Sequence, residues 1–108
     1  MKKYIDEDIL EFYLSAKKDN AAIVTDVENY LSLSDNTEYR LTNVSSLTLS
    51  YPESDFEVWM KISFSSTETI SVTFPNETQY IGTMPTFDNG QTWEISIKDS
   101  VAICWRIE

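Results

Sequence analysis

Alternation of apolar and polar residues is the feature that most constrains how this chain can fold. The alternation begins after Asp35-Asn36 and continues to the end of the chain. Side chains at every second position of an extended strand point to the same face, so this period is typical of strands with one buried face. From residue 37 onward, the sequence therefore predicts a β-sheet.

Several stretches carry the alternation clearly. Their apolar positions are Leu47, Leu49 and Tyr51; Phe56, Val58, Met60, Ile62 and Phe64; Ile70, Val72 and Phe74; Trp93, Ile95 and Ile97; and Val101, Ile103, Trp105 and Ile107. Turn-forming residues separate them at 52–55, 75–77 and 98–100. We expect the first two stretches to form a hairpin. Asp88-Asn89-Gly90 is the strongest hairpin signal and is expected to join two adjacent antiparallel strands.

The N-terminal part of the chain has a different period. Between residues 5 and 18, apolar residues recur at spacings of three and four, which predicts an amphipathic helix. Acidic residues in its first turn and lysines in its last turn oppose the helix macrodipole. Residues 21–34 fit either a strand or a second short helix with Asp19 or Asn20 as its N-cap. We favour the helix, followed by an extended segment from about Ser32.

These patterns together predict an α+β fold with two layers. One apolar face per strand is typical of an antiparallel sheet buried on one side, because a parallel sheet covered on both sides shows continuous apolar runs. We expect one N-terminal helix, possibly two, packed on one face of an antiparallel sheet of about five or six strands. No repeat or linker divides the chain, so residues 1–108 are predicted to form a single domain.

Composition and charge exclude several functions. With no histidine and one cysteine, the chain cannot form an internal disulfide, a Cys/His zinc site or an imidazole-dependent active site. The formal net charge of −10 disfavours direct binding to nucleic acid. The sequence shows no membrane span, export signal, calcium-binding loop or phosphate-binding glycine loop. We therefore expect a cytoplasmic protein that binds no membrane, metal or cofactor.

Cys104 is the one conventional soft nucleophile in the sequence. The alternation places Cys104 on the polar face of the last strand, opposite Ile103 and Trp105. A catalytic thiol requires a lowered pKa and a general base, usually histidine, and this chain has no histidine. We interpret Cys104 as a small strand residue and expect the protein not to be an enzyme.

The candidate partner-binding residues are one aromatic and four acidic side chains. Trp59 is the large aromatic residue on the polar sheet face, and tryptophan is enriched at binding hot spots. Glu53, Asp55 and Glu57 are spaced by two, and Glu94 is predicted to lie on the same face as Trp59. Other interpretations remain open: Trp59 stacks beside a basic side chain or is covered by another segment, and the acids are solvated or protect a sheet edge.

The small size, the strong negative charge and the lack of catalytic or metal-binding motifs predict a binding protein that neutralises a basic protein partner. Small acidic immunity proteins and antitoxins block nucleases or other toxins in this way. A strongly acidic surface accelerates association with a cationic cleft. The first alternative is a phage-type inhibitor or nucleic-acid mimic that blocks a DNA- or RNA-binding protein, although the acids form no linear double row. The second alternative is a small enzyme or ligand carrier, which requires a pocket within an interior rich in large apolar residues.

Overall fold

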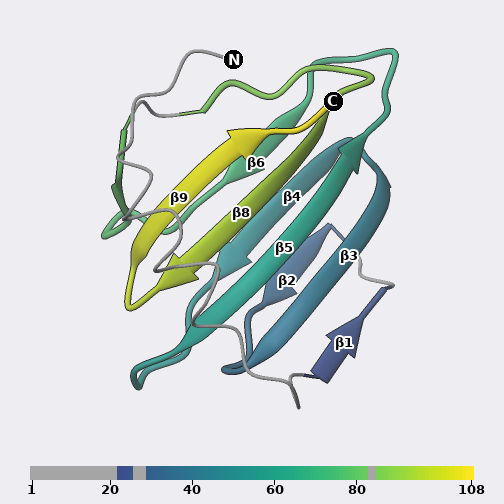
Figure 1. Ribbon diagram of the computed structural model, residues 1–108. Helices are drawn as coiled ribbons and strands as arrows, with labels where there is room; N and C mark the ends of the chain where they lie inside the picture. The colour runs from purple at the N-terminus through teal and green to yellow at the C-terminus, as the bar shows by residue number, and fades with distance from the viewer. Residues whose placement is uncertain (1–21, 26–28, 83–84) are drawn as a thin grey trace.

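The computed structural model of this chain describes residues 22–25, 29–82 and 85–108. Within these ranges the chain forms strands and no helix (Figure 1). The strands are β1 (Ala22–Val24), β2 (Tyr30–Ser32), β3 (Thr37–Val44), β4 (Ser46–Ser50), β5 (Glu57–Phe64), β6 (Ser71–Thr73), β7 (Gln79–Tyr80), β8 (Thr92–Lys98) and β9 (Val101–Arg106).

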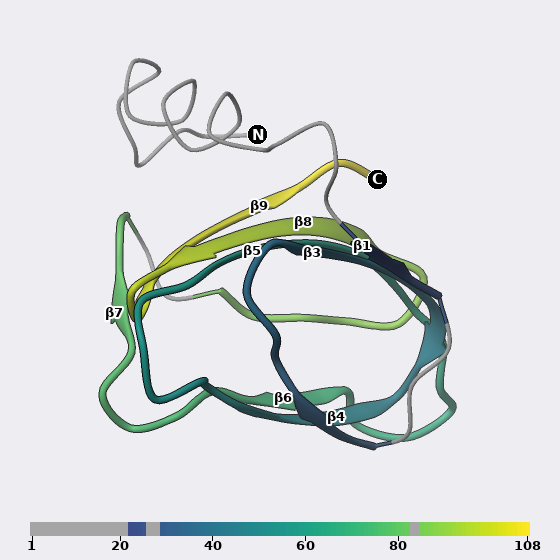
Figure 2. The same ribbon diagram turned by 90° about the horizontal axis from the view of Figure 1, so that it is seen from below.

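The strands belong to two sheets that face each other (Figure 2). The large sheet has the order β1-β3-β5-β8-β9-β7, and the small sheet has the order β2-β4-β6. From β1 to β6 the chain changes sheet after every strand, and each strand pairs in parallel with the next one in its sheet. This part is therefore a short β-solenoid, to which β8 and β9 add an antiparallel hairpin.

Two asparagine residues lie at or beside sharp connections between the sheets. Asn36 and Asn43 both have a φ of 56°, a left-handed conformation that asparagine tolerates better than most residues. Asn43 lies near the end of β3, and a single residue, Ser45, separates β3 from β4. Neighbouring turns of the solenoid then stack through backbone hydrogen bonds, because Ser71 N donates to Ser45 O at 3.0 Å.

The hydrophobic core lies between the two sheets. The large sheet contributes residues such as Leu41 and Ile62, and the small sheet contributes Leu47 and Leu49. Phe87 precedes β8, and its ring packs against those of Phe64 and Trp93, with centroids 4.9 Å apart in each pair. The following predicted core residues of the fifth strand are confirmed as buried: Phe56, Val58, Met60, Ile62 and Phe64.

The predicted α+β fold with an antiparallel sheet is wrong. A second sheet covers the apolar faces of the large sheet, and most strand pairs are parallel. In a solenoid, each strand buries one face and exposes the other, so alternation does not distinguish parallel from antiparallel pairing. The turns of this solenoid differ in length, which is why no fixed repeat is visible in the sequence. The helix expected over 5–18 lies outside the described residues.

Two local expectations are also wrong. Within 21–34, the described residues form β1 and β2 instead of a helix, consistent with the β-branched residues Ile23 and Val24. The expected hairpin across 52–55 does not form, because β4 and β5 belong to different sheets.

The predictions for the two aspartate-containing turns near the C-terminus have different outcomes. Asp88-Asn89-Gly90 leads into β8, but the described residues directly before this turn are not a strand, so it joins no hairpin. The predicted turn at 98–100 does join β8 to β9. Asp99 and Ser100 have φ values of 48° and 69°, as the tight turns of hairpins require.

Ile62 lies within β5 and is completely buried, with 0% of its surface exposed. The Ile62→Ala substitution should lower the free energy of unfolding by about 2–5 kcal/mol, because apolar contacts are lost and a cavity remains. Lys61→Ala, at the exposed neighbouring position, is the matched control and should change it by less than about 0.5 kcal/mol. Urea denaturation measures both variants, and an equally small loss for Ile62→Ala would place Ile62 outside the core.

Candidate functional site

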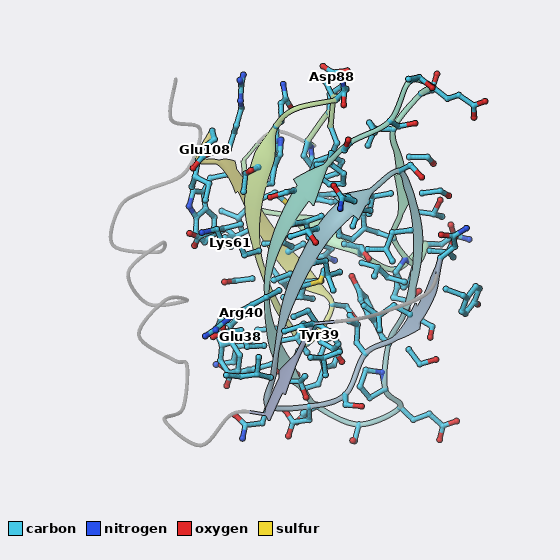
Figure 3. All side chains as sticks on the ribbon, turned by 90° about the vertical axis from the view of Figure 1, so that its right-hand side faces the viewer. Glu38, Tyr39, Arg40, Lys61, Asp88 and Glu108 are labelled. Atoms are coloured by element: carbon cyan, nitrogen blue, oxygen red, sulfur yellow. The ribbon has the colours of Figure 1, made fainter. Side chains whose placement is uncertain are left out.

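The outer face of the large sheet, away from the small sheet, contains a hollow of about 210 Å³. Two rows of side chains line it. Strand register places Glu38, Trp59 and Ser96 in one row, and Arg40, Lys61, Glu94 and Trp105 in the other. Figure 3 shows Glu38, Arg40 and Lys61 on this side of the sheet, whereas Tyr39 points toward the small sheet. We call this feature the outer hollow.

The outer hollow combines buried side chains with exposed charged ones, and opposite charges lie beside one another. Trp59 is 7% exposed and Ser96 is 2% exposed, although both lie on the outward face. Arg40 Nε donates a hydrogen bond to Glu38 Oε2, and Lys61 is the register partner of Glu94. Trp59 is therefore not an accessible aromatic anchor, and the outer hollow has no excess of one charge.

A second feature forms at the end of the solenoid where β3 and β5 begin (Figure 1, lower left). Parallel strands place their connections at the same end, so segments that are distant in the sequence meet here. These segments are the connections 33–36, 51–56, 74–78 and 99–100. Together with the start of β5 they carry six acidic residues: Asp35, Glu53, Asp55, Glu57, Glu77 and Asp99. We call this group the acidic end.

Hydrogen bonds fix two of these connections relative to β5. Asp35 Oδ1 accepts a hydrogen bond from Glu57 N at 2.9 Å, and Asn36 N donates to Glu57 O at 2.8 Å. Asp99 Oδ1 accepts a hydrogen bond from Phe56 N at 2.8 Å. The acidic end is therefore a set of connections held to one another rather than a group of independent loops.

Another hydrogen bond at the acidic end joins the β4–β5 connection to the β6–β7 connection. The hydroxyl groups of Tyr51 and Thr78 are hydrogen-bonded at 2.7 Å. Burial raises the pKa of Tyr51 to about 12, although the hydrogen bond with Thr78 lowers it. The Tyr51 hydroxyl therefore remains protonated, and this hydrogen bond remains intact, at neutral pH.

The structure divides the five predicted partner-binding residues between these two features. Trp59 and Glu94 line the outer hollow. Glu53, Asp55 and Glu57 belong to the acidic end, where Glu53 and Asp55 are exposed. Glu57 is half-buried, and its Oε1 atom lies 4.0 Å from Lys98 Nζ.

Asp35, Glu77 and Asp99 are the members of the acidic end that sequence reasoning missed. They are distant from the 53–57 cluster in the sequence and approach it through strand pairing. The only local signal was their position in turns. The described residues include no group of three or more histidine, cysteine or acidic side chains arranged to hold a metal ion.

The predicted orientation of Cys104 is wrong. Cys104 is the register partner of Ile95 and packs against the core, whereas Ile103 and Trp105 point to the outer face. Residues 101–105 are apolar or small at every position, so alternation could not determine which face is buried. Burial raises the pKa of the Cys104 thiol to about 12, which disfavours the reactive thiolate.

No family model, curated protein or solved structure matches this chain. The described part of the chain also contains no helix that is long and apolar enough to cross a membrane.

The raised pKa values predict that stability decreases in alkaline solution. Burial raises the pKa of the Cys104 thiol from 9.0 in the unfolded chain to about 12, and it raises the pKa of Tyr51 from 10.0 to about 12. Above pH 9, the unfolded state loses protons first, so the free energy of unfolding should fall as the pH rises toward 12. Urea denaturation between pH 8 and pH 11 measures this slope.

The Cys104→Ser variant is the control for this experiment, because serine has no group that titrates in this range. Its free energy of unfolding should fall less steeply with pH than that of the unmodified protein. Identical slopes for the two proteins would contradict the burial of the thiol described here.

Proposed function

We propose that this protein is a non-enzymatic binding protein that recognises a basic protein surface through its acidic end. The observation that carries the proposal is the gathering of exposed carboxylates from separate connections at one end of the solenoid. Asp35, Glu53, Asp55, Glu77 and Asp99 are all exposed there. The formal net charge of −10 adds a long-range field of the same sign.

The charge of the acidic end favours rapid association with a basic partner. A surface of one sign attracts a partner of the opposite sign and orients it before contact, which raises the association rate. The connections are already held by hydrogen bonds to Glu57, Phe56 and Thr78, so little additional ordering is needed on binding. Preorganisation of this kind reduces the entropic cost of forming an interface.

The properties of Cys104 and of the outer hollow also favour binding over catalysis. Cys104 packs in the core, and its pKa is raised, so it lacks the properties of a catalytic nucleophile. In the outer hollow, Glu38 is paired with Arg40, which reduces its suitability as a general acid or base. The acidic end is the feature with both exposure and an excess of one charge.

A protein with a cationic cleft, such as a nuclease toxin, is the partner class that this charge suits. The activity we propose is inhibition of the immunity or antitoxin type, in which the acidic end occupies the cleft. Mimicry of a nucleic acid is less well supported, because the acids converge from several connections instead of following the regular spacing of phosphates.

Charge-neutralising variants at opposite ends of the solenoid test the proposal. The pair Glu53→Gln and Asp55→Asn changes the acidic end, and the pair Asp88→Asn and Glu108→Gln changes exposed acids at the opposite end, where both residues are labelled in Figure 3. Both double variants change the net charge equally. We expect the first pair to lower the association rate roughly five- to tenfold at low salt and the second pair by about twofold or less.

The measurement uses the partner captured from the source cells and then purified, with association and dissociation rates recorded across a salt series. The association rate of the unmodified protein should fall as the salt concentration rises, because screening shortens the range of the field. Equal effects of the two double variants would show that the acidic end has no special role. An association rate that is independent of salt would contradict the proposed function.

A further inference from the structure

β6 forms one edge of the small sheet. Among the described strands, it pairs with β4 on one side and with no strand on the other. Ser71 N donates to Ser45 O, and successive residues of a strand direct their backbone groups to opposite sides. The N–H and C=O groups of Val72 therefore point away from β4. A sheet edge of this kind is a template for pairing with another strand.

A second hollow, of about 240 Å³, lies beside this edge. Ile70, Val72 and Phe74 line it on the β6 side, and Pro85 and Phe87 line it on the other. The three β6-side residues are half-buried, and Phe87 is anchored in the core by its contact with Phe64. Ser71 and Thr86 also line the hollow, so polar groups lie beside the apolar side chains, and the apolar part of the wall suits one aliphatic or aromatic side chain. We call this feature the edge hollow.

The charge around this edge favours a basic ligand. The sequence contains no lysine or arginine between Lys61 and Lys98. Glu68 precedes β6 and Glu77 follows it, and both side chains are exposed. Many natural proteins protect exposed sheet edges with lysine, but acidic residues flank this edge at both ends. Basic residues at the two ends of an added strand would therefore face opposite charges.

We propose that β6 is a strand-addition site for an extended segment of a partner protein, with an apolar centre and basic flanks. The segment pairs with the free edge of β6 and inserts one apolar side chain into the edge hollow. β6 is three residues long and is followed closely by Pro75, so pairing is short and the hollow supplies much of the affinity. The basic character of the partner rests on the proposed function, whereas the pairing mode is independent of it.

The test uses the full chain and a synthetic peptide. The peptide has the β4 sequence Ser-Leu-Thr-Leu-Ser between terminal lysines, because β4 already pairs with β6 on its other side. A matched peptide carries N-methyl groups on alternate backbone nitrogens, which removes the hydrogen-bond donors but preserves the charge. Fluorescence anisotropy should show at least about tenfold weaker binding of the N-methylated peptide, since two or more backbone hydrogen bonds are lost.

A pair of protein variants tests the edge hollow. Thr86 is an exposed residue that lines this hollow, and Thr67 is an exposed residue outside it. Thr86→Trp should fill the hollow and weaken peptide binding about tenfold, whereas Thr67→Trp should leave the affinity unchanged. Thermal unfolding of both variants confirms that the fold is retained.

The possible outcomes distinguish this proposal from the proposed function. Equal binding of the two peptides, or no binding of either, would overturn strand addition. If binding depends on Glu53 and Asp55 but not on N-methylation, acidic recognition stands and strand addition fails. If binding is sensitive to N-methylation and to Thr86→Trp but not to neutralisation of the acidic end, strand addition stands and the proposed role of the acidic end fails.

Discussion

Burial of apolar strand faces between two sheets is the interaction on which the rest of this structure depends. Each strand of the solenoid has one apolar face, and that face is covered by strands from the opposite sheet. Leu41 and Ile62 on the large sheet and Leu47 on the small sheet belong to the same buried cluster. Because each turn also pairs with its neighbour along the sheet, no strand obtains its full stabilisation alone.

This scaffold separates the requirements of folding from those of binding. The core needs apolar residues at alternate strand positions, whereas the connections remain free to carry charge. Parallel stacking places alternate connections at the same end and brings Asp35 beside the start of β5, whereas the antiparallel β8–β9 hairpin brings Asp99 to the same end. The proposed acidic surface is therefore a consequence of topology acting on residues that have no local relationship in the sequence.

The two sheets differ in how they end. The β8–β9 hairpin extends the large sheet beyond β5, but among the described residues the small sheet ends at β6. Phe87, in the segment before β8, packs into the core against Phe64. The edge hollow lies between that segment and β6. The unequal sheet widths thus leave the β6 edge beside the edge hollow, and a free sheet edge is what strand addition requires.

The sequence by itself determined the position of most strands after residue 37, the buried face of β5 and the turn at 98–100, because these depend on local alternation and turn chemistry. It also excluded histidine-dependent catalysis. Tertiary structure decided which strands pair, their parallel direction, the orientation of Cys104 and the gathering of the acidic end. Alternation indicates only that one face of a strand is buried. Long-range packing determines which segment covers that face.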